Sequence, residues 1–142
     1  MSDCIFCKII DGSIPSVKLY EDDQVLAFFD ISQVTKGHTL VIPKDHHESI
    51  YELPEKVATH LFSVIPNIAN ALKRTFEPTG LNLLNNNGKD AGQTVFHYHI
   101  HLIPRYGEPG LHGALWENAS NDVNVNQLAD YAQEVMKNLT QK

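Results

Sequence analysis

One stretch decides the fold of this chain: Phe96-His97-Tyr98-His99-Ile100-His101-Leu102-Ile103-Pro104-Arg105, preceded by Gly92-Gln93-Thr94-Val95. Histidine stands at every second position, and a period of two is typical of a β-strand, whose successive side chains point to opposite faces. We therefore predict a strand with two different faces. One face carries the three histidines, about 7 Å apart along the strand. The other carries apolar side chains, namely Phe96, Tyr98, Ile100 and Leu102.

The segments around this strand indicate an antiparallel sheet. Residues 17–20, 24–31 and 38–43 alternate or run apolar between polar turns, and Pro43 closes the third segment. Residues 81–85 are predicted as a fourth strand, joined to the histidine strand by a turn-rich loop. Together these segments predict about five antiparallel strands.

Two segments have the apolar spacing of amphipathic helices. The first runs from about residue 54 to about residue 76. Pro66 lies inside it and predicts a kink, because proline removes one backbone hydrogen bond. The second runs from 125 to 139, with Asn124 or Asn126 as its N-cap. Sheet and helices together predict an α+β fold with one long helix and a C-terminal helix.

Length and charge narrow the function classes. A chain of 142 residues suits one domain, and a net charge of −6 argues against a nucleic-acid-binding surface, which usually carries a basic excess. The N-terminus lacks the pattern of a secretory signal, and no apolar run approaches the roughly 20 residues that span a bilayer. We therefore expect a cytoplasmic protein that binds neither nucleic acid nor membrane, with its cysteines reduced.

Cys4 and Cys7 form a CxxC pair near the N-terminus. This spacing can place both sulfurs on one metal ion, but it supplies only half of a tetrahedral site, and the pair could instead be small core residues. His46 or His47, together with one histidine of the strand, would complete a Cys2His2 set. Such a closed set would be structural rather than catalytic.

The histidine row has three interpretations. The imidazoles could be structural, each satisfied by hydrogen bonds, or they could bind a metal ion. They could also be catalytic, because a neutral imidazole with Nδ1–H held by a carbonyl keeps Nε2 free to attack phosphorus. The preceding loop suits a phosphate: Gly92 allows close backbone approach, Gln93 offers an amide and Thr94 a hydroxyl. The last two interpretations are compatible with each other.

The alternating histidines resemble the signature of the histidine-triad (HIT) superfamily. The preceding Gly92-Gln93-Thr94 resembles its Hint branch of purine nucleotide hydrolases. The similarity spans residues 4–105 of a single domain, 1–142, and leaves a tail and helix at 106–142. The matching segments are Cys4-Ile5-Phe6-Cys7-Lys8-Ile9-Ile10, Ala27-Phe28-Phe29-Asp30-Ile31-Ser32, His38-Thr39-Leu40-Val41-Ile42-Pro43-Lys44, Asn86 and Gly92-Gln93-Thr94-Val95-Phe96-His97-Tyr98-His99-Ile100-His101-Leu102-Ile103.

The resemblance implies a homodimer with its sheets joined edge to edge, and a covalent nucleotidyl-histidine intermediate. It implies His99 as nucleophile, supported by His101 and His38, with Gln93 and Thr94 contacting the phosphate or leaving group. The implied nucleotide contacts are Asp30 and Asn86 with the ribose region, and Phe6, Phe28, Ile31 and Leu40 with the base. The implied structural zinc site consists of Cys4, Cys7, His46 and His97. His47, His60 and His112 are left as surface residues.

The resulting hypothesis is a hydrolase or transferase that cleaves purine nucleoside phosphoramidates or dinucleoside polyphosphates at the α-phosphate. A nucleotide-binding sensor or scaffold with little turnover is the alternative from another class. A third is a purely structural zinc module, which predicts unfolding by chelators and no thermal stabilisation by nucleotides.

Overall fold

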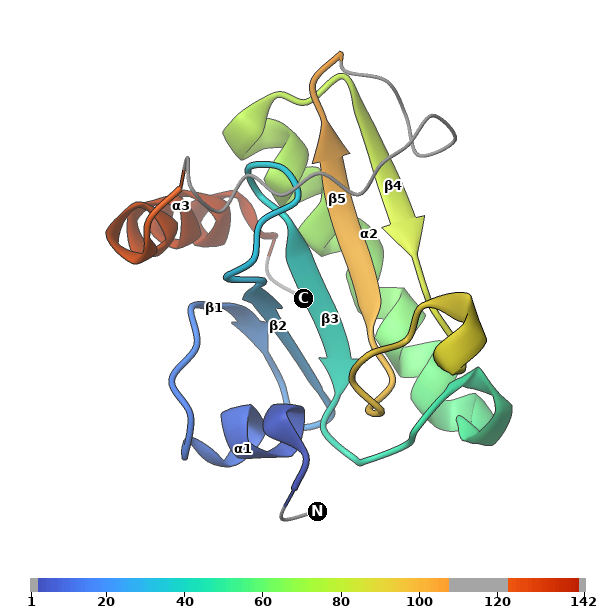
Figure 1. Cartoon of the computed structure of the whole chain (residues 1–142). Coiled ribbons are helices and arrows are strands. Elements are labelled where there is room, and N and C mark those ends of the chain that lie inside the picture. Colours follow the sequence, from blue (N-terminus) through green and yellow to red (C-terminus); the bar gives the residue numbers. More distant parts are fainter. Residues whose placement is uncertain (1–2, 108–122, 141–142) are drawn as a thin grey trace.

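Five strands form one antiparallel sheet in the order β1-β2-β3-β5-β4 (Figure 1). The structure, a computed structural model, describes residues 3–107 and 123–140. The strands are β1 (Lys18–Glu21), β2 (Val25–Phe29), β3 (Thr39–Pro43), β4 (Gly80–Leu84) and β5 (Ile100–Arg105). The helices are α1 (Ile5–Asp11), α2 (Glu55–Phe76) and α3 (Val125–Asn138), and two 3-10 turns span Ile50–Glu52 and Lys89–Ala91. The predicted α+β class and five-stranded sheet are confirmed.

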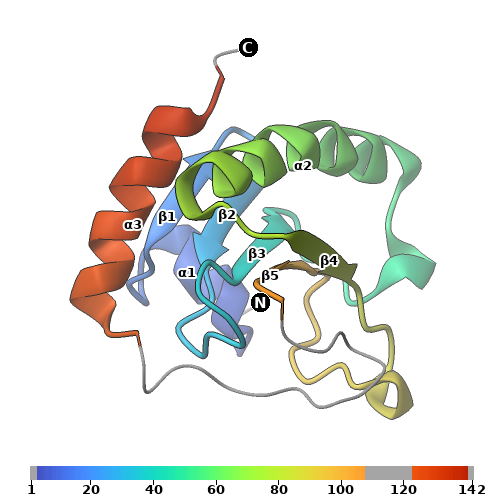
Figure 2. The same cartoon turned by 90° about the horizontal axis from the view of Figure 1, so that it is seen from above.

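One face of the sheet is covered by α2 and α3. Seen from above, α2 lies along one side of the strands and α3 lies beside β1 (Figure 2). Alternate residues of the strands, such as Ala27, Val41 and Leu102, join a buried cluster with Leu61 and Leu128 of the two helices. This cluster is the main core, and its burial of apolar surface is the principal force that holds the helices on the sheet.

The opposite face of the sheet is packed against α1. Phe6 of this helix forms a second buried cluster with Leu26 and Phe28 of β2 and with Leu40 of β3. Leu40 is the partner of His101 in the β3–β5 register, so His101 lies beside this second cluster. The histidines therefore lie on the face of the sheet that the short N-terminal helix α1 covers, and not on the face that packs into the main core.

The two predicted helices are present. α2 continues through Pro66 as one helix, and α3 begins after Asn124, whose side chain accepts from the backbone N–H of Gln127 in a capping box. Asn124 is thus the N-cap of the two candidates. Among the described residues, neither helix combines the length and hydropathy required to cross a bilayer. The predicted irregular tail falls mostly at 108–122, outside the described residues.

The helix α1 was not predicted from the sequence. It is only 7 residues long, too short for apolar periodicity to be informative. Cys4 is its N-cap, and the Cys4 sulfur accepts a hydrogen bond from the backbone N–H of Cys7 at 3.3 Å. Gly12 ends the helix with a φ of 88°, a conformation that glycine adopts without steric cost. The CxxC pair therefore lies on the first turn of a helix.

The predicted start of the histidine strand was wrong. β5 begins at Ile100, so His97 and His99 precede the strand and only His101 lies within it. The backbone N–H of Tyr98 donates to the carbonyl of His47 at 2.6 Å, and Asn85 donates to the carbonyl of His99 at 3.0 Å. Loop partners replace a neighbouring strand at these positions. Tyr98 is nevertheless buried in the main core, whereas Phe96 is 45% exposed.

Candidate active site and metal centre

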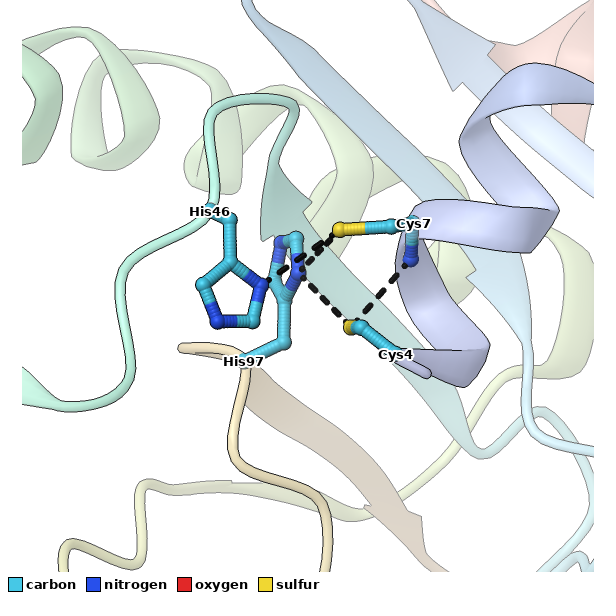
Figure 3. A group of neighbouring side chains, drawn as sticks. All are labelled: Cys4, Cys7, His46 and His97. Atoms are coloured by element: carbon cyan, nitrogen blue, oxygen red, sulfur yellow. Dashed lines mark hydrogen bonds between the residues drawn. The ribbon is translucent and has the colours of Figure 1, made fainter. Parts of the chain in front are cut away.

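Cys4, Cys7, His46 and His97 converge from three parts of the chain (Figure 3). The cysteines come from the first turn of α1, His46 from the loop after β3, and His97 from the segment before β5. Nδ1 of His97 lies 3.4 Å from the Cys4 sulfur and 3.6 Å from the Cys7 sulfur. Nδ1 of His46 lies 3.4 Å from the Cys7 sulfur. These four side chains form a cluster that could hold a metal ion.

The spacing of these atoms fits a tetrahedral zinc site. With Zn–S bonds of about 2.3 Å and Zn–N bonds of about 2.05 Å, tetrahedral angles separate sulfur from nitrogen by about 3.6 Å. Three of the four sulfur–nitrogen pairs in the cluster lie 3.4, 3.4 and 3.6 Å apart. Burial and the neighbouring Cys4 raise the pKa of the Cys7 thiol. A cation between the two sulfurs would reverse that effect, because a coordinating thiol is deprotonated.

The hydrogen bond between the His97 ring and the Pro43 carbonyl leaves Nδ1 of His97 free to bind a metal ion. Its Nε2 lies 2.7 Å from the carbonyl oxygen of Pro43, an acceptor, so Nε2 carries the proton. The lone pair is then on Nδ1, the atom that faces the two sulfurs. Burial is the main cause that lowers the pKa of His97 to about 4. A ligating histidine that donates its other N–H to a backbone carbonyl is the usual supporting arrangement in metal sites.

His99 has the opposite arrangement of its ring nitrogens. Its Nδ1 lies 2.7 Å from the carbonyl oxygen of His97, so Nδ1 carries the proton and Nε2 carries the lone pair. Burial lowers the pKa of His99 and outweighs the hydrogen bond to His97, which raises it. The ring of Phe6 meets that of His99 edge-on, with centroids 5.1 Å apart. His99 is thus a neutral imidazole at neutral pH, with its lone pair on Nε2.

His38 and His101 form a buried imidazole pair. Nε2 of His38 lies 2.9 Å from Nδ1 of His101, and the rings of His101 and His99 have centroids 4.9 Å apart. Burial, followed by the charge of His101, lowers the pKa of His38 to about 3. Burial, followed by the charge of His99, lowers the pKa of His101 to about 4. Both rings are therefore neutral at pH 7. Of the two predicted supporting histidines, His101 adjoins His99, and His38 adjoins His101.

Asp30 completes a second group of potential metal ligands with His38 and His101. The backbone N–H of Val34 donates to Nδ1 of His38 at 3.1 Å, which places the ring proton of His38 on Nε2. That proton occupies the nitrogen of His38 that would bind a metal, so this arrangement disfavours metal coordination by His38. One Asp30 oxygen lies 3.7 Å from Nε2 of His38, and burial raises the pKa of the carboxyl.

The predicted base slot is assembled in part. Phe6, Phe28 and Leu40 share the second buried cluster, and the rings of Phe6 and Phe28 meet edge-on with centroids 5.6 Å apart. Ile31 is 66% exposed and lies outside that cluster. Its position after the end of β2, where the chain leaves the sheet, accounts for its exposure.

The amide of Gln93 bonds to backbone groups of two loops, its own loop between β4 and β5 and the loop after β3. Its amide nitrogen donates to the carbonyls of Glu48 and Val95 at 2.7 and 3.0 Å, and its amide oxygen accepts from the N–H of Gly88 at 2.8 Å. The residue is 4% exposed. A phosphate contact would have to break one of these bonds, whereas the neighbouring Thr94 is exposed. Gly92 has a φ of 93°, and a Cβ added to it would lie 3.7 Å from the side chain of Asn86.

The sequence did not indicate two backbone supports of the site. One is the Pro43 carbonyl, which fixes the ring of His97, and the other is Asn85, which fixes the carbonyl of His99. Because Asn85, Asn86 and Asn87 are consecutive, the sequence did not indicate which of them supports the site. Of the three histidines predicted at the surface, His47 and His60 are partly buried, and His60 pairs with Asp22 at 2.8 Å. His112 lies outside the described residues.

Comparison with known proteins places this geometry in a family. The HIT domain family matches residues 11–108. The chain is 56% identical over 137 residues to the protein named hit of Bacillus subtilis, across 96% of this chain and 94% of that protein. It is 38% identical over 125 residues to an adenosine 5′-monophosphoramidase of Candida albicans, across 85% and 82% of the two chains. It is also 47% identical over 104 residues to an adenylylsulfatase of Arabidopsis thaliana, across 73% and 53%.

Solved structures agree with these relatives. A HIT family protein of Bacillus anthracis superposes with a TM-score of 0.76 at 57% identity, across 97% of this chain and 98% of that chain. A zinc-bound histidine triad family protein of Mycobacterium smegmatis superposes with a TM-score of 0.80 at 31% identity, across 96% and 93%. Sequence, fold and the triad geometry agree, and the chain belongs to the HIT domain family.

Proposed function

We propose that this protein is a hydrolase of purine nucleoside phosphoramidates, with His99 as the nucleophile. The observation that carries the proposal is the 2.7 Å contact between Nδ1 of His99 and the carbonyl of His97, because it leaves a neutral ring with its lone pair on Nε2. A relative from Candida albicans is named an adenosine 5′-monophosphoramidase, which supports a P–N bond as the scissile bond. Dinucleoside polyphosphates, with a nucleotide as leaving group, are the second substrate class.

The reaction has two steps. Nε2 of His99 attacks the α-phosphorus, the P–N bond breaks, and the departing amine takes the proton of Nε2 of His101. The negative charge left on His101 is balanced by the positive charge on the neighbouring nucleotidyl-His99 ring, whose Nδ1 keeps its proton. A water molecule then attacks the phosphorus of the nucleotidyl-histidine, with His101 accepting its proton, and releases the nucleoside monophosphate. The His38–His101 contact of 2.9 Å supports this role, since it holds Nδ1 of His101 as an acceptor.

Binding of the nucleotide is assigned to the residues around the triad. Phe6, Phe28 and Leu40 would contact the base, and Ile31, exposed beyond the end of β2, would contact it from the solvent side. Asp30 would accept hydrogen bonds from the ribose hydroxyls, and Asn86 would contact the ribose-phosphate region. Thr94 is exposed and would donate its hydroxyl to the phosphate or the leaving group.

We further propose structural zinc at Cys4, Cys7, His46 and His97. The sulfur–nitrogen distances of 3.4 to 3.6 Å and the zinc-bound relative from Mycobacterium smegmatis support it. The ion would tie α1 and the loop after β3 to residue 97. With four protein ligands, the site has no open position for a substrate, so its contribution is to stability and positioning.

A homodimer is also proposed, formed through the edge of the sheet. β4 is an outer strand, and its Leu83 is 49% exposed. Unpaired backbone groups and an exposed leucine on an outer strand favour pairing with a second copy. Light scattering after gel filtration would give the mass of a dimer for the wild type. Leu83→Lys should shift that mass toward the monomer, and a monomeric wild type would contradict the proposal.

The activity is tested with adenosine 5′-phosphoramidate. Wild-type protein should release AMP, and His99→Ala should reduce kcat by at least about 1,000-fold while the protein stays folded. His60→Ala is the matched control, because His60 is a partly buried histidine that pairs with Asp22 away from the triad. Turnover by His99→Ala equal to that of the wild type would refute the assignment. Nucleotide binding without turnover in the wild type would favour a sensor.

A further inference from the structure

We propose that Gln33 is a positioning residue that fixes which nitrogen of His38 carries the proton. The proposal rests on the proposed function only for its catalytic consequence, and the state of the His38 ring can be measured without any substrate. Gln33 lies in the loop between β2 and β3 and is fully buried. It does not contact the triad rings in any hydrogen bond, so its effect passes through the backbone of the loop.

All the hydrogen-bonding capacity of the Gln33 amide is used within this loop. Its nitrogen donates to the carbonyls of Asp30 and His38, the latter at 2.7 Å. Its oxygen accepts from the backbone N–H of Gly37 at 2.8 Å and from that of His38 at 3.2 Å. An amide offers two donors and two acceptor sites, and each is matched here. The side chain therefore joins the residue after β2 to the residue before β3.

The backbone N–H of the next residue, Val34, orients the ring of His38 through a hydrogen bond. The backbone N–H of Val34 donates to Nδ1 of His38 at 3.1 Å. Since an N–H cannot donate to a nitrogen that already carries a proton, this hydrogen bond favours the tautomer with the lone pair on Nδ1 and the proton on Nε2. It competes with a hydrogen bond between His38 and the backbone of Ser32, which raises the pKa of the ring. Gln33 fixes the peptide that carries this N–H, because its side chain is anchored on both sides of the loop.

The fixed tautomer sets the direction of the imidazole pair. Nε2–H of His38 points to Nδ1 of His101 at 2.9 Å, so the proton of His101 is on its own Nε2. This is the nitrogen that would protonate a leaving group. With the opposite tautomer of His38, Nδ1 of His101 could carry the proton instead, and Nε2 of His101 would be an acceptor. The Val34 N–H thus favours the tautomer of His38 that leaves the proton of His101 on Nε2.

Two substitutions probe the Gln33 amide. Gln33→Met keeps the length of the side chain and removes all of its hydrogen bonds. Gln33→Glu keeps the shape and the acceptors but places an oxygen against the carbonyls of Asp30 and His38, so it removes both donated bonds. Gln24→Met is the control, because Gln24 is an exposed glutamine in another turn between strands.

The first measurement is the ¹⁵N chemical shifts of the His38 ring in the ligand-free protein. The wild type and Gln24→Met should show a protonated Nε2 and an unprotonated Nδ1. The Gln33 variants should show a mixture of tautomers. A wild type with a protonated Nδ1, or folded Gln33 variants with an unchanged His38 tautomer, would overturn the proposal. If Gln33→Met fails to fold, Gln33→Glu supplies the comparison.

The second measurement compares two leaving groups. A phosphoramidate of an alkylamine needs protonation to depart, and a nitrophenyl ester does not. The Gln33 variants should lose kcat by about 10–100-fold on the alkylamine substrate and by less than about 3-fold on the ester. A purely structural role would lower both rates equally and would overturn the catalytic part. A wild type without turnover would refute the proposed function, while the ¹⁵N result would still decide the role of Gln33.

Discussion

His97 and His99 are joined by a hydrogen bond of 2.7 Å between Nδ1 of His99 and the carbonyl oxygen of His97. The side chain of the same His97 belongs to the Cys4–Cys7–His46 cluster. One residue therefore connects the candidate metal centre to the proposed nucleophile: the ring of His97 faces the sulfurs, and its carbonyl accepts from the ring of His99. We therefore expect that a metal outside the reaction would still affect the rate, because it would hold the residue whose carbonyl accepts from His99.

Loss of the metal is expected to lower both stability and activity. Cys7→Ser should remove zinc from the purified protein and lower the free energy of unfolding by on the order of 3–5 kcal/mol, since folding and metal binding are coupled. We expect kcat to fall as well, through the His97 carbonyl. Metal content by mass spectrometry and urea denaturation would measure these effects. His47→Gln, which changes the neighbouring histidine outside the cluster, should keep one zinc per chain.

Gln93 and Thr94 are adjacent, but we expect a Gln93 variant to lose stability and a Thr94 variant to lose activity. Gln93→Met would leave the Gly88 N–H and two carbonyls without partners, and should lower the free energy of unfolding by about 2–4 kcal/mol. Thr94→Val alters an exposed hydroxyl and should leave stability unchanged within about 0.5 kcal/mol, while reducing kcat about 10-fold. Urea denaturation and phosphoramidate kinetics would separate the two. A fully stable Gln93→Met would mean that its amide is not the structural link described above.

The buried imidazole pair predicts loss of stability in acid. On folding, the pKa of His38 falls from 6.5 to about 3 and that of His101 from 6.5 to about 4. Below about pH 6.5 the unfolded chain binds these protons more readily, so stability decreases as the pH falls toward 3–4 and is unaffected by this pair above 6.5. Each group adds up to about 1.4 kcal/mol per pH unit. In urea denaturation, His38→Asn should show a shallower slope between pH 6 and 4 (about one proton less); equal slopes would contradict the buried neutral ring.

Gly37, next to His38, is expected to tolerate no side chain. Its φ is 94°, and an added Cβ would lie 2.9 Å from the ring of Phe76. Gly12 has a similar φ of 88° but open space around the position of a Cβ. Gly12→Ala should therefore cost about 1 kcal/mol, from backbone conformation alone. Gly37→Ala should cost about 1–3 kcal/mol more, from the clash with Phe76. Thermal denaturation of the two variants would test the difference, and equal losses would exclude the clash.

The sequence predicted those features that depend on periodicity. The alternation of the histidines with Tyr98, Ile100 and Leu102 correctly separated the triad from the main core. The apolar spacing in α2 and α3 also predicted both helices, with the cap at Asn124. These patterns arise because one face of each element is buried, so they are visible without knowledge of the tertiary structure.

Features that depend on contacts between loops could not be predicted. β5 starts at Ile100 because Tyr98 donates to the His47 carbonyl, a pairing that leaves no trace in the local pattern. The hydrogen bonds of the Gln33 amide could not be predicted either, because the sequence does not distinguish a buried glutamine from one in an exposed turn. Gln93 was predicted to contact the phosphate or the leaving group, and the hydrogen bonds of its amide to three backbone groups could not be read from the sequence.

The most direct test of this account is a search for the covalent intermediate. Wild-type protein mixed with adenosine 5′-phosphoramidate and quenched in milliseconds should gain the mass of one adenylyl group. Peptide mapping under conditions that preserve P–N bonds should place that group on Nε2 of His99. His99→Ala should gain no mass. An adduct on any other residue, or rapid turnover by the wild type with no adduct at any quench time, would contradict His99 as the nucleophile.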